Sequence, residues 1–171
     1  MIGADVLLTI AEVSVAFAGF ASVVVLFQHR DPVKWSPRVV VRLRTMIESS
    51  LCALLLALLP FALHHLGLSG EQLWGWSSGL AAGALVLLSS AVVRRSLRFI
   101  RSRELSRPFA FATFGVNVLV FGALVLNAAG VLFQREFGPY LLGVIWALAF
   151  ASLMFLRVVV FPDAGAARRD E

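Results

Sequence analysis

Five long runs of apolar residues constrain this chain more than any other feature of its sequence. Each run has about 20 residues, the length at which an α-helix crosses the ~30 Å hydrocarbon core of a bilayer. The runs cover about residues 5–27, 46–66, 73–93, 109–133 and 139–161. Across the whole chain 60% of the residues are hydrophobic and 15% are charged, whereas soluble domains have about 45–50% and 25%. The sequence therefore predicts an integral membrane protein.

The runs predict helices rather than strands. They are about twice as long as the strands of a membrane barrel, and polar and apolar residues do not alternate along them. We expect a single all-α domain of five transmembrane helices over residues 1–161 and a disordered cytoplasmic tail over 162–171. The first run is expected to stay as an uncleaved span. A signal peptide begins with basic residues, whereas Asp5 and Glu12 precede the first basic residue, Arg30.

Basic residues fall almost entirely on one side of the predicted spans. Of the 15 lysines and arginines, 14 lie between spans one and two, between spans three and four, or from the end of span five onward, and Arg135 alone lies on the other side. The positive-inside rule then places the N-terminus outside and the C-terminus in the cytoplasm. Orientation and anionic lipid, not nucleic acid, thus explain the net charge of +5. Trp74, Trp76 and Tyr140 are expected to mark the outer interface.

Small and polar side chains recur along one stripe of the first span. At helical spacing, the stripe contains Asp5, Thr9, Glu12, Ala16, Gly19 and Val23. An ionisable side chain inside a span is costly unless it faces water or a partner, so Glu12 is a candidate functional residue. If several copies met around an axis, the stripe would line an ion pathway with acidic rings that attract cations.

A second interpretation of Glu12 keeps it within one bundle. The carboxyl group is then protonated or hydrogen-bonded against a polar side chain of another span, namely Asn127, His64, His65 or Ser77. Both interpretations remain open from the sequence.

Glu48 is a further ionisable residue, near the inner end of span two. We expect it to form an intramembrane charge pair with Arg157 of span five, at a similar depth, or with Arg44, four residues earlier on the same helix. Pairing lowers the cost of holding both charges in the membrane. Snorkelling of Arg157 to the cytoplasmic interface is an equally adequate explanation of that residue.

Amide and small side chains are expected to hold the helices together. Asn117 and Asn127 of span four can hydrogen-bond between helices, at about 1 kcal/mol or less each. Small residues that allow close approach, within or between subunits, are Gly79 and Gly83 in span three and Gly143, Ala147 and Ala151 in span five. Spans two and three align with spans four and five at an offset of 63 residues. The alignment indicates either a duplicated helical hairpin or chance matches between segments that are rich in the same few residue types.

Two predicted helices continue beyond the membrane at the cytoplasmic side. Helix two is expected to begin near Ser36, and helix three to run past its membrane exit. There Arg94, Arg98 and Arg101 fall on one face, an arrangement that favours binding to anionic lipid headgroups.

Catalysis and metal binding have little support in the sequence. His64 and His65 are adjacent and therefore point about 100° apart on a helix. The chain contains no nucleotide-binding loop, GxSxG motif or HExxH motif. We expect no enzymatic activity, no cofactor and no bound metal.

Several short motifs resemble those of small, uncharacterised bacterial integral membrane proteins. They are Ala11-Glu12, Phe17-Ala18-Gly19-Phe20, Trp35-Ser36-Pro37 and Arg42-Leu43-Arg44, with Leu66-Gly67-Leu68 and the segment 138–143 further along. The resemblance implies a multi-pass protein of the bacterial inner (cytoplasmic) membrane, and it supplies no activity.

Two functional hypotheses follow from these observations. The first is a homo-oligomeric channel-like protein that conducts cations or protons, with the stripe of helix one along the path. The second is a non-conducting scaffold or accessory subunit whose basic cytoplasmic loops bind anionic lipid or a protein partner.

Overall fold

The structure is a computed structural model that describes residues 3–28, 37–100 and 107–160. This part of the chain forms five helices: α1 (Ala4–Gln28), α2 (Pro37–His65), α3 (Gly70–Ile100), α4 (Arg107–Ala129) and α5 (Phe137–Val160). All five are long and apolar enough to cross a membrane. The predicted all-α class and five helices of spanning length are confirmed, and α2 begins close to Ser36 and α3 continues to Ile100. Where the membrane lies along these helices stays a prediction. The predicted tail, 162–171, lies outside the described residues.

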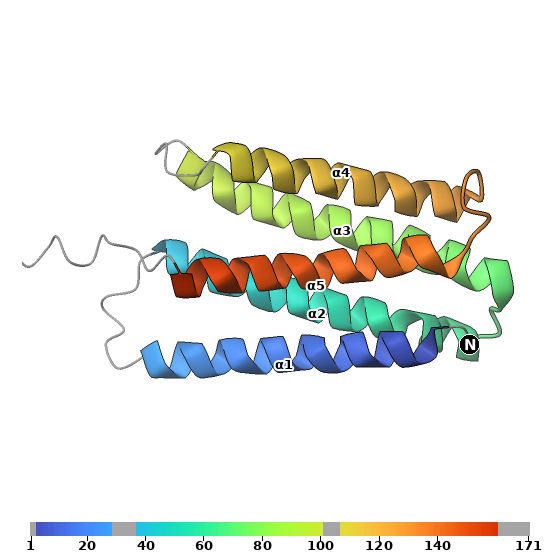
Figure 1. Ribbon diagram of the computed structural model, residues 1–171, viewed down its shortest axis with the longest axis horizontal. Helices are drawn as coiled ribbons and strands as arrows, with labels where there is room; N and C mark the ends of the chain where they lie inside the picture. The colour runs from blue at the N-terminus through green and yellow to red at the C-terminus, as the bar shows by residue number, and fades with distance from the viewer. Residues whose placement is uncertain (1–2, 29–36, 101–106, 161–171) are drawn as a thin grey trace, which may run out of the picture.

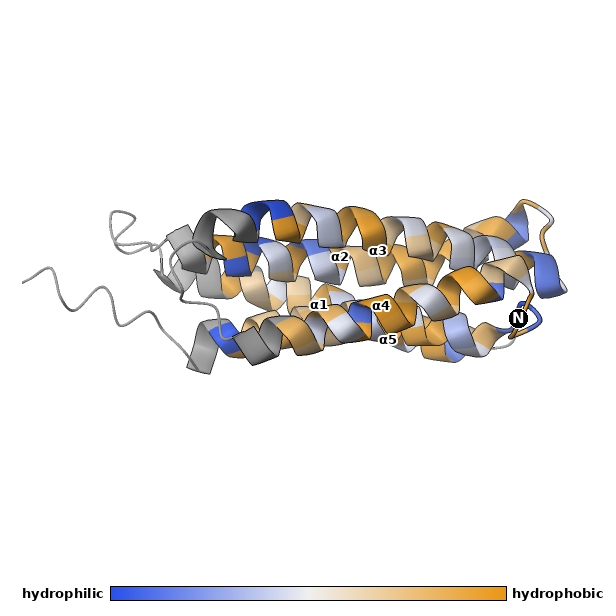
Figure 2. Cartoon of the chain, turned by 90° about the horizontal axis from the view of Figure 1, so that it is seen from above, coloured by the Kyte–Doolittle hydropathy of each residue, from blue (hydrophilic) through white to orange (hydrophobic). Residues whose placement is uncertain are grey.

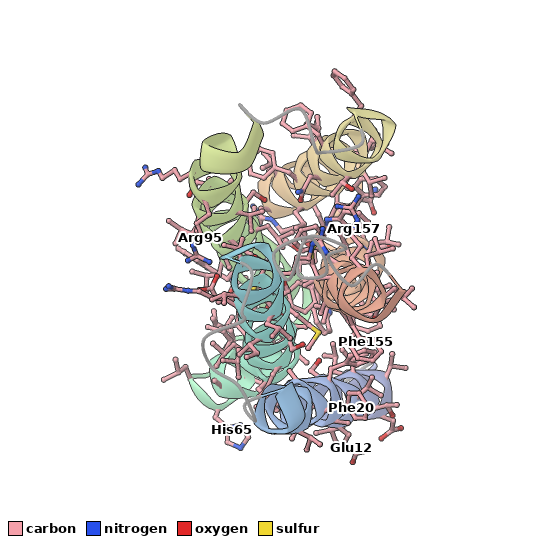
Figure 3. All side chains as sticks on the ribbon, turned by 90° about the vertical axis from the view of Figure 1, so that its left-hand side faces the viewer. Glu12, Phe20, His65, Arg95, Phe155 and Arg157 are labelled. Atoms are coloured by element: carbon pink, nitrogen blue, oxygen red, sulfur yellow. The ribbon has the colours of Figure 1, made fainter. Side chains whose placement is uncertain are left out.

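The helices run up and down in a long bundle (Figure 1). Seen from one end, α2 and α5 form the middle of the bundle, α3 and α4 lie on one side, and α1 lies on the other (Figure 3). α1 packs against α2 and α5. Figure 2 shows hydrophobic residues along the middle of the helices and hydrophilic ones mainly toward the two ends. The arrangement leaves α1 at an edge, with one face packed and the other uncovered.

Small side chains form much of the interface between α1 and the bundle. Ala11, Ser14 and Ala21 are buried on α1, and Ala53 and Ala57 are buried on α2. Small residues let the backbones of two helices approach closely, which is how membrane helices gain packing contacts without a hydrophobic driving force. The hydroxyl of Ser14 donates to the carbonyl oxygen of Ile10 at 2.7 Å, so this polar group is satisfied within its own helix.

Tyr140 connects α5 to α2 at a point where the α2 helix lacks a hydrogen bond. Pro60 lies inside α2, and because proline has no N–H, the carbonyl of Leu56 loses its usual helical partner four residues on. The hydroxyl of Tyr140 donates to that carbonyl oxygen instead. Tyr140 and Pro60 are fully buried, so this bond satisfies a carbonyl that water does not reach.

Aromatic rings surround this contact. The ring centroid of Trp74 lies 5.8 Å from that of Tyr140 and 4.9 Å from that of Phe137. Trp74 and Tyr140 are both buried in the bundle, near the starts of α3 and α5, and that they mark the outer interface stays a prediction. Their hydrophobic rings complete the core beside the proline. Trp76, by contrast, is exposed.

The pairing of Tyr140 with the Leu56 carbonyl predicts that the effects of Tyr140→Phe and Pro60→Ala on the free energy of unfolding are not additive. Tyr140→Phe leaves the carbonyl unpaired, and we expect the free energy of unfolding in mixed micelles to fall by about 1–2 kcal/mol. Pro60→Ala restores an N–H that can bond to the same carbonyl. In the Pro60→Ala background, Tyr140→Phe should therefore destabilise the protein clearly less. Equal losses in the two backgrounds would show that the tyrosine does not replace the missing helical donor.

Candidate functional site

The polar stripe of α1 lies on the uncovered face of the helix. Its members, Asp5, Thr9, Glu12, Ala16, Gly19 and Val23, are all exposed. At 100° per residue, the stripe is centred on the side of α1 opposite the buried Leu7, Ser14 and Ala21. Figure 3 shows Glu12 pointing away from the other helices. The candidate pathway residues are thus collected on one surface of the subunit.

None of the four polar side chains proposed as partners of Glu12 within its own bundle contacts it in the described residues. Glu12 is exposed, and three of the four proposed partners bond elsewhere. The Nδ1 atom of His64 lies 3.2 Å from the carbonyl oxygen of Leu68, and that of His65 lies 2.8 Å from the carbonyl oxygen of Phe61. Asn127 bonds to neighbours of its own, and Ser77 is buried without a hydrogen-bond partner among the described residues.

Asn127 joins three segments at one end of the bundle. Its Nδ2 atom donates to the hydroxyl of Ser78 on α3 at 2.8 Å and to the carbonyl oxygen of Glu136 at 2.9 Å. Its Oδ1 atom accepts from the backbone N–H of Glu136, also at 2.9 Å. The side chain is fully buried. It ties α4 to α3 and to the turn before α5, which confirms the predicted packing role.

Asn117 makes a similar contact farther along α4. Its Oδ1 atom accepts a hydrogen bond from Nε1 of Trp146 on α5 at 3.0 Å. Sequence reasoning identified the asparagine but not the tryptophan. The two asparagines together link α4 to both of its neighbours.

Of the small residues predicted for helix packing, those of α5 are buried within the subunit, and Gly79 and Gly83 of α3 are exposed. A Cβ added at Gly143 would lie 3.0 Å from Cδ1 of Leu124 on α4, and Ala147 and Ala151 are buried. A Cβ at Gly79 would meet the Cβ of Ala128 at 3.8 Å, an ordinary contact. At Gly83 it would meet nothing within 4 Å in the described part of the chain. Gly143 therefore marks the closest approach of this group.

Glu48 belongs to a cluster of charges between α2 and α3. Its Oε1 atom accepts from Nε of Arg44 at 2.8 Å and from Nη2 of Arg95 at 3.0 Å, and its Oε2 atom accepts from Nη1 of Arg95 at 2.6 Å. The contact with Arg44 is one of the two pairs that the sequence predicts. The expected pair with Arg157 was wrong: Glu48 uses Arg95, and the carbonyl oxygen of Arg157 accepts from Nη1 of Arg42 at 3.4 Å.

The arginines expected to bind lipid are only partly described. Arg94 is exposed near the end of α3. The side chain of Arg98 and the whole of Arg101 lie outside the described residues. Within residues 3–28, 37–100 and 107–160, no three His, Cys, Asp or Glu side chains come together to hold a metal ion.

Comparisons with known proteins give no relative from which a function can be transferred. No protein-family model, no curated protein and no solved structure matches the sequence. The resemblance to small bacterial membrane proteins therefore stays a prediction.

Proposed function

We propose that the protein is the subunit of a homo-oligomeric, channel-like membrane protein that conducts cations or protons. In this proposal α1 of each copy contributes its polar stripe to the conducting path. The observation that supports it is the position of Glu12, an ionisable side chain that points outward from a helix long enough to span the membrane.

The physical argument starts from the cost of that position. An acidic side chain at the centre of a span costs about 2.5–3.5 kcal/mol on insertion scales when it faces lipid. The packing of α1 within its own subunit does not lower this cost, because the stripe lies opposite the face that packs on α2 and α5. A water-filled path or the same stripe of other copies would lower this cost.

The spacing of the stripe also supports contact between copies. Successive members are separated by four, three, four, three and four residues, which is the heptad repeat of helices that wind around one another. Ala16 and Gly19 are small enough for close approach. Asp5 and Glu12 would then form two acidic rings, which attract cations.

The distribution of basic residues supports an orientation for this assembly. We infer that the N-terminus faces outward and the C-terminus faces the cytoplasm. A bacterial inner membrane is what the resemblance to small bacterial membrane proteins implies. The Asp5 ring would then lie at the outer mouth, and the small residues would form a narrow neck farther in.

A second candidate is a non-conducting scaffold or accessory subunit. It is favoured by the exposed Arg94 at the end of α3, which shares a predicted basic face with Arg98 and Arg101. In this candidate, the basic face binds anionic lipid or a protein partner at the cytoplasmic surface.

The conduction proposal is tested by ion flux into proteoliposomes that contain the purified protein. We expect Glu12→Gln to lower cation flux by about tenfold or more, as a rise of about 1.4 kcal/mol in the barrier would. Glu71→Gln is the matched control, because Glu71 is also exposed and lies in the first turn of α3, away from the stripe. Flux that is absent in the wild type, or equally affected by both changes, would refute the proposal.

The assembly is tested separately by cysteine cross-linking. In a Cys52→Ser background, which removes the single native cysteine, Ala16→Cys should form disulfide-linked dimers in the membrane under mild oxidation. Leu119→Cys is the control, because Leu119 is exposed near the middle of α4. Efficient cross-linking at position 119 and none at position 16 would place the contact between copies on the wrong helix for this proposal.

A further inference from the structure

Arg44, Glu48 and Arg95 form a compact ion cluster on the surface between α2 and α3. The three side chains are 64%, 28% and 26% exposed. One carboxylate accepts three N–H groups from two guanidinium groups, so the cluster keeps a net charge of +1. Arg95 contacts Glu48 with two nitrogens at once, the paired geometry that fixes the orientation of a guanidinium group.

The cluster keeps hydrogen-bond donors that Glu48 does not use. In the part of the chain that the structure describes, Arg44 bonds to Glu48 through Nε alone, which leaves its two terminal nitrogens available. The Nε atom of Arg95 is likewise not among the atoms that contact Glu48. Guanidinium donors held side by side match the oxygens of a phosphate group.

The position of the cluster indicates where such a phosphate would come from. The apolar stretch of α2 begins at Val40, and that of α3 ends at Arg95, so the cluster lies toward one end of both stretches, where lipid headgroups would lie if these helices span a bilayer. Figure 3 shows Arg95 on the outside of the bundle, beside α2 and α3. A ligand at this site therefore reaches it from the surrounding lipid.

An apolar track continues from the cluster toward the middle of the bilayer. On α2 the same exposed face carries Leu51, Leu55 and Leu58, at three- and four-residue spacing after Glu48. On α3 the face below Arg95 carries Ala84, Leu88 and Ala91, which are partly buried. A cationic cluster above an apolar track is complementary to a phospholipid, which has an anionic phosphate group above apolar acyl chains.

We propose that the ion cluster binds the phosphate group of one anionic phospholipid, whose acyl chains lie along the track on α2 and α3. Arg44 and Arg95 are the ligands of the phosphate. Glu48 is a positioning residue, which holds Arg95 beside Arg44 so that both guanidinium groups face the headgroup. The net charge of the cluster selects an anionic lipid over a zwitterionic one. The proposal is independent of ion conduction, because it concerns a different surface from the stripe on α1.

The role of Glu48 separates this proposal from attraction by net charge alone. If charge alone governed binding, Glu48→Gln would strengthen it by removing a negative charge. If Glu48 organises the site, the same change weakens binding, because Arg95 is released while the total positive charge rises. The two explanations thus predict opposite signs for one substitution.

The test counts bound lipids by native mass spectrometry. The protein is placed in nanodiscs of phosphatidylcholine with a minor fraction of phosphatidylglycerol, and retained phosphatidylglycerol is compared among variants. Arg44→Gln and Arg95→Gln should each weaken retention about fivefold, the effect of one basic residue near an anionic headgroup. Glu48→Gln should weaken it as well. Arg94→Gln removes the same charge from the neighbouring exposed arginine, which is not among the ligands of Glu48, and should weaken retention clearly less than Arg95→Gln.

Three results would overturn the proposal. The first is stronger retention in Glu48→Gln, and the second is an equal loss in Arg94→Gln and Arg95→Gln. The third is binding of inorganic phosphate to the detergent-solubilised protein with the same dependence on Arg44 and Arg95, which would make the site one for free phosphate. If Glu48→Gln fails to fold, the comparison of Arg44→Gln with Arg94→Gln still decides, because both side chains are exposed.

Discussion

A polar group inside a bilayer has no water to bond with, and this constraint organises the whole structure. Where Pro60 removes a donor from α2, Tyr140 supplies one from α5. Where α4 places Asn127 in the core, its side chain forms three hydrogen bonds, one with Ser78 and two with the backbone of Glu136. The same requirement makes Glu12 the exception, because it alone among these groups faces away from its own bundle. An exposed ionisable side chain on a helix of spanning length directs attention to what surrounds the subunit.

The fold places its two candidate surfaces apart. α1 lies at one edge of the bundle and presents the stripe outward, while the ion cluster of Arg44, Glu48 and Arg95 lies between α2 and α3 (Figure 3). Copies that met through α1 would leave the cluster facing the surrounding lipid. Assembly and lipid binding therefore do not compete for the same surface.

The helices were predictable from the sequence because the thickness of the hydrocarbon core sets their length. The stripe on α1 was predictable from helical spacing, but the side it faces depends on packing by Ala11, Ser14 and Ala21, which bury the opposite face. The partner of Glu48 was missed because several arginines lie at similar depth, and only the packing of α2 beside α3 selects Arg95. The link from Tyr140 to Leu56 joins residues 84 positions apart, and no local pattern brings them together.

The central claim is that α1 stripes of several copies face one another around a shared axis. Cryo-electron microscopy of the full-length protein in lipid nanodiscs tests it most directly, because the arrangement of copies and the direction of Glu12 are read from one map. The account predicts a closed ring of subunits with α1 innermost and the Glu12 carboxyl groups directed toward the axis. Single five-helix subunits, or a ring with α4 innermost and Glu12 facing lipid, would contradict it.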